Sequence, residues 1–129
     1  MNRDIRFRAW DTREKKMYHD VGWFEEQWLS PDTESGALLN VIIPMQFTGL
    51  YDRNGQEIYE GDVVLIPHTY PRGDTKIGIV RWSEKFVAFI LELIEYRDLC
   101  DIHLANEVLG NIYENGGLLP YNPHENGSD

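Results

Sequence analysis

The amino-acid sequence predicts a mainly β protein, either all-β or α+β, and three observations support this. Four tryptophans, seven tyrosines and five phenylalanines are mixed with β-branched residues along the 129 residues, as is typical of strands. Eleven glycines punctuate the chain at short intervals. Asn54 and Gly55 lie between two apolar runs, which is the strongest local signal of a β-hairpin. A chain of this length predicts one domain, residues 1–121, and the polar residues 122–129 predict a disordered tail.

The first residues predict a small N-terminal hairpin unit. Side chains in residues 5–10 alternate in character, which is typical of a half-buried strand. Residues 11–15 are polar and turn-like, and residues 16–18 would return as the partner strand. One face of the first strand would carry Ile5, Phe7 and Ala9, and the other Arg6, Arg8 and Trp10.

The segment that follows is rich in aromatic residues. Residues 21–29 hold Trp23, Phe24 and Trp28, with the last two four positions apart, so a short helix and an aromatic loop both fit. These rings, or the apolar run Phe86–Leu91, could form an exposed interface, or all could belong to the core, and both alternatives stay open. Residues 30–40 predict an exposed loop.

A strand and a hairpin are expected next. Residues 41–47 are apolar and β-branched, and Pro44 cannot donate to a ladder, so this is an edge strand or contains a bulge. Residues 50–51 and 57–59 flank Asp52-Arg53-Asn54-Gly55, which predicts a tight hairpin because Asn and Gly accept a positive φ.

The second half repeats a plan of turn, strand, loop and strand. A tight Gly61-Asp62 turn leads into a strand at residues 63–66. Residues 68–76 predict a loop, residues 77–82 a strand and residues 83–85 a turn.

The last elements complete a small barrel in this prediction. Residues 86–91 are apolar throughout and are either a strand covered on both faces or the start of a helix running to Leu99, so Phe86–Leu99 remains open between strand and helix. Residues 108–113 predict a last short strand or an extended turn. Residues 60–114 therefore suit a small, strongly bent antiparallel β-barrel of the SH3-like kind.

Composition excludes several classes of protein. Apolar residues make up 42% and charged residues 26%, and no stretch approaches the roughly 18 apolar residues of a transmembrane helix. The first residues carry charges of both signs, unlike a secretory signal. Cys100 is the only cysteine, so no intrachain disulfide can form, and the cytoplasm is the expected compartment.

The charge is unevenly distributed. The formal net charge is −10, yet residues 1–16 hold six basic and three acidic side chains and are +3, which leaves −13 on the other 113 residues. Such an acidic body repels nucleic acid and anionic membranes, and no membrane partner is expected. The basic hairpin is an exception, because it combines cations with an aromatic ring as single-strand binders do. The candidate interaction surface consists of Arg6, Arg8, Trp10, Arg13, Lys15 and Lys16.

No constellation of catalytic or metal-binding residues stands out. Cys100 and His103 form a single pair, whereas zinc sites usually need four ligands and catalytic cysteines a flanking signature. Glu57, Glu60 and Asp62 could act as acid and base, but carboxylates beside a glycine turn commonly accept backbone hydrogen bonds. Neither phosphate-binding glycine pattern occurs. We therefore expect no catalytic residue, metal site or cofactor, and a protein that is not an enzyme.

Four blocks, in order between residues 5 and 115, carry a family resemblance. They are residues 5–11 with Lys16-Met17, the central run 46–64, residues 78–82, and residues 107–115. The central run contains Asp52-Arg53-Asn54-Gly55-Gln56-Glu57-Ile58-Tyr59-Glu60-Gly61-Asp62 and is long enough to be specific. Together these blocks resemble the YopX family, small proteins carried by phages and prophages, mostly in Gram-positive bacteria.

The resemblance implies a mainly β fold, a phage or prophage origin and a bacterial cytoplasmic setting. It implies no catalytic residue, because the family has no established activity. Residues 20–39 and 67–76 match no motif and are expected to be individual insert loops. The signature residues are mostly turn-makers, which favours maintenance of shape over chemistry: Gly49, Asn54, Gly55, Gly61, Asp62 and Gly110.

Four hypotheses for function follow. The leading one is a non-enzymatic phage accessory protein that binds another protein of phage or host, or a second copy of itself as a homo-oligomer. The alternative is a nucleic-acid-binding module that uses the basic hairpin. Two further ideas are an acidic face that imitates DNA and a hydrolase that uses Glu57, Glu60 or Asp62.

Overall fold

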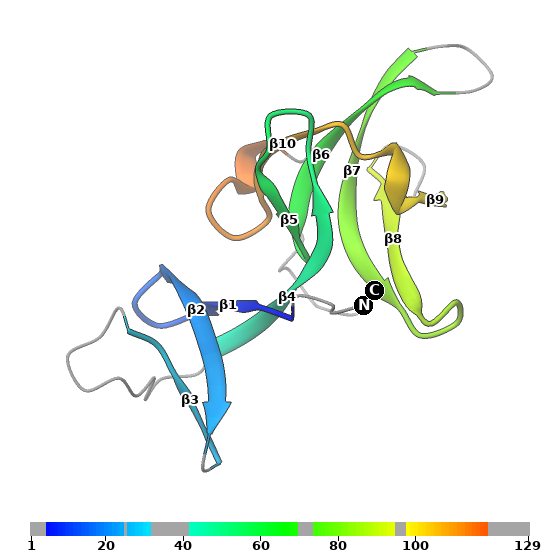
Figure 1. Cartoon of the computed structure of the whole chain (residues 1–129). Helices are drawn as coiled ribbons and strands as arrows, with labels where there is room; N and C mark the ends of the chain where they lie inside the picture. Colours follow the sequence, from blue (N-terminus) through cyan, green and yellow to red (C-terminus); the bar gives the residue numbers. More distant parts are fainter. Residues whose placement is uncertain (1–4, 25, 32–41, 70–73, 95–97, 119–129) are drawn as a thin grey trace. The chain divides into compact units, whose positions relative to one another are not determined.

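The computed structural model describes residues 5–24, 26–31, 42–69, 74–94 and 98–118, and these residues form two five-stranded antiparallel sheets (Figure 1). The first sheet has the order β3 (Gln27–Leu29), β2 (Lys16–Phe24), β1 (Phe7–Asp11), β4 (Ile42–Tyr51) and β5 (Glu57–Tyr59). The second has the order β10 (Glu107–Asn111), β6 (Asp62–Thr69), β7 (Asp74–Ser83), β8 (Ala88–Leu93) and β9 (Leu99–Asp101). Two 3₁₀ turns, η1 (Ile102–Leu104) and η2 (Gly116–Leu118), complete the described elements.

The predicted fold class is confirmed at the level of a mainly β protein. The described residues contain no α-helix, so the all-β form of the prediction applies to them. They also show no closed barrel, and closure in the SH3-like manner stays a prediction. Most of the predicted loop at residues 30–40 and the whole predicted tail at residues 122–129 lie outside the described residues.

The chain divides into two compact units, Met1–Gly49 and Leu50–Asp129, and each is described by itself. We call them unit 1 and unit 2. That residues 1–121 form a single domain stays a prediction.

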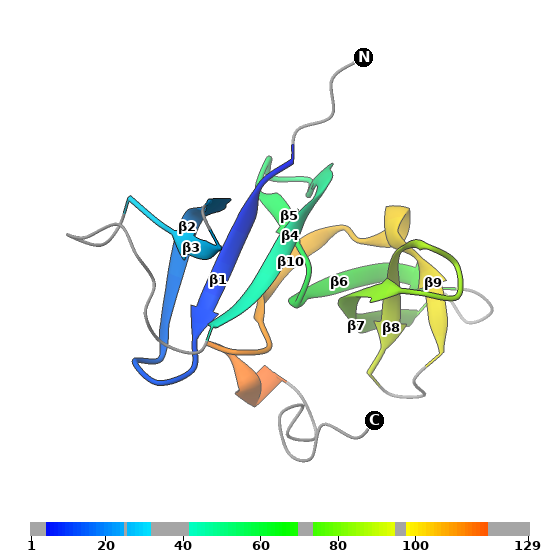
Figure 2. The ribbon, with the colours of Figure 1, turned by 90° about the horizontal axis from the view of Figure 1, so that it is seen from below.

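Unit 1 is built around β1, which lies between β2 and β4 (Figure 2). The predicted N-terminal hairpin is confirmed, because β1 and β2 pair antiparallel from Asp11 opposite Lys16 onward. A small core of Ala9, Tyr18 and Val21 forms on one face of this hairpin. Strand β1 has a neighbouring strand along each edge, and it carries buried side chains on both of its faces.

A β-bulge interrupts the β1–β2 pairing and decides which β2 residues share a face. Tyr18 lies opposite Ala9, and Val21 lies opposite Phe7. Between these two pairs, β2 has two residues where β1 has only one. Asp20, in the bulge, has a φ of +53°. The extra residue reverses the alternation, and the side chains of Lys16, Tyr18, Val21 and Trp23 therefore lie on the same face.

The aromatic segment forms a hairpin, so both predictions for residues 21–29, a helix and a loop, are wrong. Strand β2 continues to Phe24 and pairs with β3, with Trp23 opposite Trp28 and Phe24 opposite Gln27. Phe24 and Trp28 are four positions apart, as on one face of a helix, because the loop that joins their two strands is very short. Glu26 reverses the chain at a φ of +65°.

The predicted strand around Pro44 is confirmed, and it is longer than expected. Strand β4 pairs with β1 in an uninterrupted register in which Pro44 lies opposite Ala9. The regular register excludes the predicted bulge at Pro44 on this side of the strand.

Unit 2 contains the predicted Asn-Gly hairpin and the predicted Gly-Asp turn. Gly55 has a φ of +82°, and Asp52 donates its backbone N–H to the carbonyl of Gln56 at 2.9 Å. Gly61 has a φ of +87°, and its N–H donates to the carbonyl of Val80 at 2.8 Å. These left-handed positions explain the glycines, because other L-residues adopt them at a cost.

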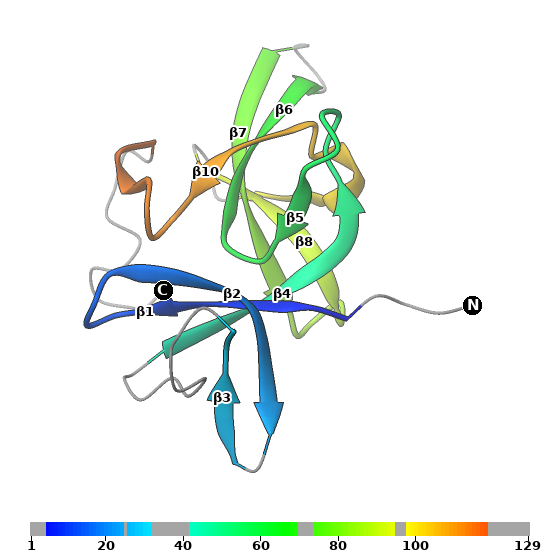
Figure 3. The same cartoon turned by 60° about the vertical axis from the view of Figure 1, so that its left-hand side comes forward.

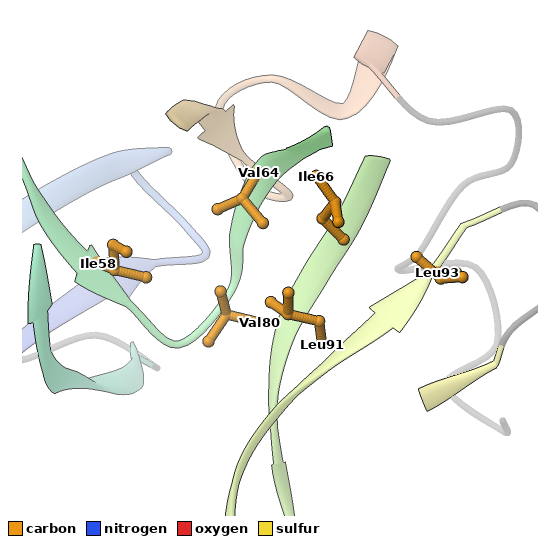
Figure 4. Close-up of a cluster of buried hydrophobic side chains, with 6 residues drawn as sticks. All are labelled: Ile58, Val64, Ile66, Val80, Leu91 and Leu93. Carbon is orange, nitrogen blue, oxygen red and sulfur yellow. The ribbon is translucent and has the colours of Figure 1, made fainter. Parts of the chain in front are cut away.

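Strands β6 and β7 form the centre of unit 2 and are buried on both faces. One face packs Ile58, Val64, Ile66, Val80, Leu91 and Leu93 (Figure 4). The other packs Val63, Ile79, Ile94 and Ile112. Fully burying a side chain of this kind contributes about 1.5–3 kcal/mol, so these residues dominate the stability of the unit.

The described residues of Phe86–Leu99 decide between the two predicted alternatives, a strand and a helix. Ala88–Leu93 is strand β8, paired with β7, and Phe86 and Val87 lie in the turn that precedes it. Residues 95–97 lie outside the described part, and Leu99 begins β9. The helical alternative is wrong for β8, whereas the predicted last strand is confirmed as β10.

Candidate functional site

The turn between β1 and β2 presents three cations to solvent. Asp11 is buried, and its Oδ1 accepts hydrogen bonds from the N–H groups of Arg13 at 2.9 Å and Glu14 at 2.8 Å. This carboxylate holds the turn in shape. Arg13, Lys15 and Lys16 are exposed, and we call them the basic turn.

Half of the predicted interaction surface does not lie on this turn, which corrects the prediction. Arg8 and Trp10 are buried, with only 7% and 8% of their area exposed, and Arg6 is half-buried with its guanidinium 4.6 Å from the centre of the Phe47 ring. The physical reason is that β1 is a central strand, and its neighbour β4 contributes the buried Met45 opposite Arg8. Of the six predicted surface residues, the three of the basic turn are exposed.

The carboxylate of Asp52 acts as a structural anchor in unit 2. Its Oδ1 accepts hydrogen bonds from the N–H groups of Asn54 at 2.8 Å and Gln56 at 2.9 Å, and its Oδ2 accepts one from Val108 at 2.9 Å. Burial raises the pKa of this carboxyl, but the three donors outweigh burial, and the net pKa is lowered.

The carboxylates near the Gly-Asp turn have structural partners too. Asp62 is buried, and its Oδ2 accepts the N–H of Tyr59 at 2.7 Å. Glu57 accepts the hydroxyl of Tyr59 at 3.1 Å, and Glu60 is half-buried. These contacts match the predicted backbone role of Asp62.

Cys100 and His103 do not form a nucleophile–base pair in the described contacts. The Nδ1 of His103 lies 2.9 Å from Oδ1 of Asp101, which also accepts the backbone N–H of His103 at 2.8 Å. Burial, with a contribution from the charge of Asp98, raises the pKa of the Cys100 thiol. A raised pKa disfavours the reactive thiolate.

The β2–β3 hairpin exposes large aromatic side chains. Trp23 and Phe24 are 59% and 61% exposed. The rings of Trp23 and Trp28 meet edge to face with centroids 5.3 Å apart, and Trp28 meets Phe7 in the same manner at 5.7 Å. We call Trp23, Phe24 and Trp28 the aromatic hairpin.

A second exposed apolar group lies at the end of the β7–β8 hairpin. Trp82, Phe86 and Val87 are 45%, 56% and 72% exposed, and Trp82 meets Phe89 edge to face at 5.1 Å. Val87 has a φ of +51°, which is unusual for a β-branched residue. We call these three residues the β7–β8 tip. The apolar run 86–91 was open between an exposed interface and the core, and its first two residues are exposed.

The comparison with protein families identifies the chain. The family model described as "YopX protein" matches residues 6–120, across both units. The chain belongs to the YopX family. This confirms the resemblance carried by the four blocks between residues 5 and 115.

A solved structure has a similar fold. The crystal structure of protein EF1440 from Enterococcus faecalis is similar with a TM-score of 0.62 and 26% sequence identity, and the match covers 92% of this chain and 99% of that chain. A search of curated proteins found no match. In the part of the chain that the structure describes, no helix has the length and hydropathy that a membrane span requires.

Proposed function

We propose that this YopX-family protein is a non-enzymatic phage or prophage accessory protein that works by binding another protein in the bacterial cytoplasm. The observation that carries the proposal is the exposure of large apolar side chains at two hairpins, the aromatic hairpin and the β7–β8 tip. Burying each of these side chains would stabilise the fold by about 1.5–3 kcal/mol, but at both hairpins they stay exposed. Aromatic residues of this kind are enriched in protein interfaces.

Two finer points belong to the proposal. We propose that the sheet of unit 2 is the core of an SH3-like barrel, which its antiparallel strand order β10-β6-β7-β8-β9 supports. A cytoplasmic location is supported by a single half-buried cysteine, which needs no oxidising compartment.

Affinity capture with paired variants tests the proposal. The tagged chain, a Trp23→Ala/Phe24→Ala variant and a Trp82→Ala/Phe86→Ala variant are incubated with host lysate, and bound proteins are identified by mass spectrometry. Leu104→Ala is the matched control, because Leu104 is also exposed and apolar but lies in η1. We expect at least one hairpin variant to lose a protein that the control retains.

Two results would contradict binding as the function. Identical captured proteins for all four chains would remove the role of the hairpins. Turnover of a small molecule that disappears in Cys100→Ala or Glu57→Gln would make the protein an enzyme.

Nucleic-acid binding is the second candidate, and the exposed basic turn favours it specifically. A gel shift with single-stranded DNA at about 50 mM salt, weakened by Arg13→Ala/Lys15→Ala/Lys16→Ala, would support it. Three cations permit only a weak, strongly salt-dependent complex. Absence of a shift at this salt concentration would remove the candidate.

A further inference from the structure

We propose that unit 1 mediates self-association, in which the basic turn of one copy binds the aromatic hairpin of a second copy. This deepens the proposed function and rests on it in one respect, namely that the partner is a protein. The proposal commits to a second copy because the two surfaces complement each other in charge and in chemistry.

The two surfaces lie at opposite ends of one strand. Strand β2 begins at Lys16, beside the basic turn, and ends at Phe24, in the aromatic hairpin (Figure 3). At about 3.3 Å per residue, the nine residues of β2 separate the two ends by about 26 Å. The Debye length at physiological salt is about 8 Å, so the ends cannot neutralise each other within one copy.

Each end carries charges that the described residues leave without an ion pair. Arg13 and Lys15 are exposed at the basic end, Glu26 is exposed at the aromatic end, and Asp20 is exposed midway along β2. Among the residues that the structure describes, none of these four makes an ion pair. An intermolecular contact would therefore gain attraction without breaking a described ion pair.

The chemistry of the two ends also fits. A Lys or Arg cation above an aromatic face within about 6 Å is attracted by the ring, and neighbouring carboxylates add to the attraction. Unit 1 already makes such contacts internally, with Arg6 over Phe47 at 4.6 Å and Lys16 over Tyr18 at 4.8 Å. The edge-to-face contact of Trp23 with Trp28 restrains the Trp23 ring before binding, which reduces the entropy lost on association.

The bulge makes a reciprocal contact geometrically accessible. Because the extra residue reverses the alternation, Lys16 and Trp23 lie on the same face of the sheet. In a two-fold symmetric dimer each copy offers the same patch, so Lys16 of each copy would meet Trp23 of the other. Without the bulge, these side chains would point to opposite faces.

The charge of unit 1 favours a protein over a nucleic acid as the occupant of the basic turn. Residues 1–49 hold six basic and eight acidic side chains, which leaves a net charge of −2. A polyanion is repelled by this net charge and gains little apolar contact, whereas a second copy carries the same net charge but offers the rings of the aromatic hairpin beside Glu26.

Sedimentation velocity of the full chain over about 1 μM to 1 mM tests the proposal. We expect association that weakens as salt rises from about 0.05 to 0.5 M. Two variants alter the charges: Lys15→Glu/Lys16→Glu makes the basic turn acidic, and Asp20→Asn/Glu26→Lys removes the net negative charge of β2 and the aromatic hairpin. Asn replaces Asp20 because Asn tolerates a positive φ. We expect each variant alone to associate at least tenfold more weakly than the wild type, and an equimolar mixture to recover association. Glu84→Lys, an exposed charge reversal in unit 2, is the matched control and should associate as the wild type does.

Three outcomes would overturn the proposal. A chain that stays monomeric at 1 mM overturns self-association directly. If the aromatic-hairpin variant nevertheless loses a captured lysate protein, the proposed function stands without self-association. Association that persists in both variants places the interface elsewhere. A monomeric chain whose basic turn shifts single-stranded DNA identifies nucleic acid as the occupant instead.

Discussion

The carboxylate of Asp52 accepts a hydrogen bond from the backbone N–H of Val108, 56 residues further along the chain, at 2.9 Å. The other oxygen of the same carboxylate holds the turn at residues 52–56 through the N–H groups of Asn54 and Gln56. One side chain therefore shapes a hairpin turn and attaches it to strand β10.

Removing this carboxylate should destabilise unit 2. We expect Asp52→Ala to lower the free energy of unfolding by about 2–3 kcal/mol, because buried backbone donors lose a charged acceptor. The stabilisation should depend on pH. Since the folded pKa is lowered below its ordinary value of 3.8, the stabilisation is present above about pH 4 and is lost as the pH falls through the folded pKa.

Denaturant unfolding of Asp52→Asn and wild type between about pH 2.5 and 7 measures this effect. The difference in unfolding free energy should shrink at the acid end. Asp101→Asn is the control, because hydrogen bonds from His103 also lower the pKa of Asp101 but its carboxylate is exposed. A difference that grows on acidification would contradict the role of the charge.

Gly110→Ala should destabilise the end of β10. A Cβ at this position would lie 2.5 Å from Oδ1 of Asn115 and 2.9 Å from its Cβ, so the Asn115 side chain must move. That Oδ1 accepts the N–H of Asn111 at 3.1 Å, and the hydrogen bond would be lost with the movement. We expect a loss of about 1–3 kcal/mol in chemical denaturation.

Gly117→Ala is the control for this substitution, since a Cβ there meets nothing within 4 Å. Its unfolding free energy should change by less than about 0.5 kcal/mol. Equal effects of the two substitutions would mean that crowding against Asn115 is not the cause.

Val87→Gly should raise the melting temperature. Val87 has a φ of +51° and is 72% exposed, so the wild type bears a conformational cost of about 1–2 kcal/mol with little burial in return. Val87→Ala keeps the left-handed strain and should not stabilise the chain, which separates strain from exposure. A lower melting temperature for Val87→Gly, measured by calorimetry, would contradict this account.

Cys100 should react slowly with thiol reagents. Burial and the nearby charge of Asp98 raise its pKa, so less thiolate is present at a given pH than in free cysteine. We expect alkylation of Cys100 by iodoacetamide at about pH 8 to be slower than that of free cysteine. In Asp98→Asn the alkylation rate should rise part of the way toward that of free cysteine. Faster alkylation than free cysteine would indicate an activated thiol.

Local turn chemistry made much of unit 2 predictable. The Asn54-Gly55 pair and Gly61 both need a positive φ, which only a few residues adopt readily, so they marked the hairpin and the turn correctly. The apolar run at residues 63–66 predicted a strand, and in the structure Val63 and Val64 pack into different clusters on its two faces.

The candidate interaction surface was less predictable because it depends on strand order. Alternation in residues 5–10 predicted a half-buried strand with Arg8 and Trp10 outside. Only the pairing of β1 with β4, contributed by residues more than 30 positions later, buries that face. The bulge at Asp20 is equally invisible in the sequence, because Asp20 carries no turn signal of its own and reveals its positive φ only in the structure.

The order β10-β6-β7-β8-β9 also determines when each strand can pair with its neighbour during synthesis on the ribosome. Strands β6, β7 and β8 follow one another and can pair as they emerge, but the outer edge of β6 must wait for β10, whose Val108 lies opposite Val64. During that interval an apolar strand presents an open edge, the arrangement most prone to pairing with other chains. A translation product cut short before residue 107 would keep this edge permanently, and we expect it to aggregate instead of accumulating as a smaller soluble protein.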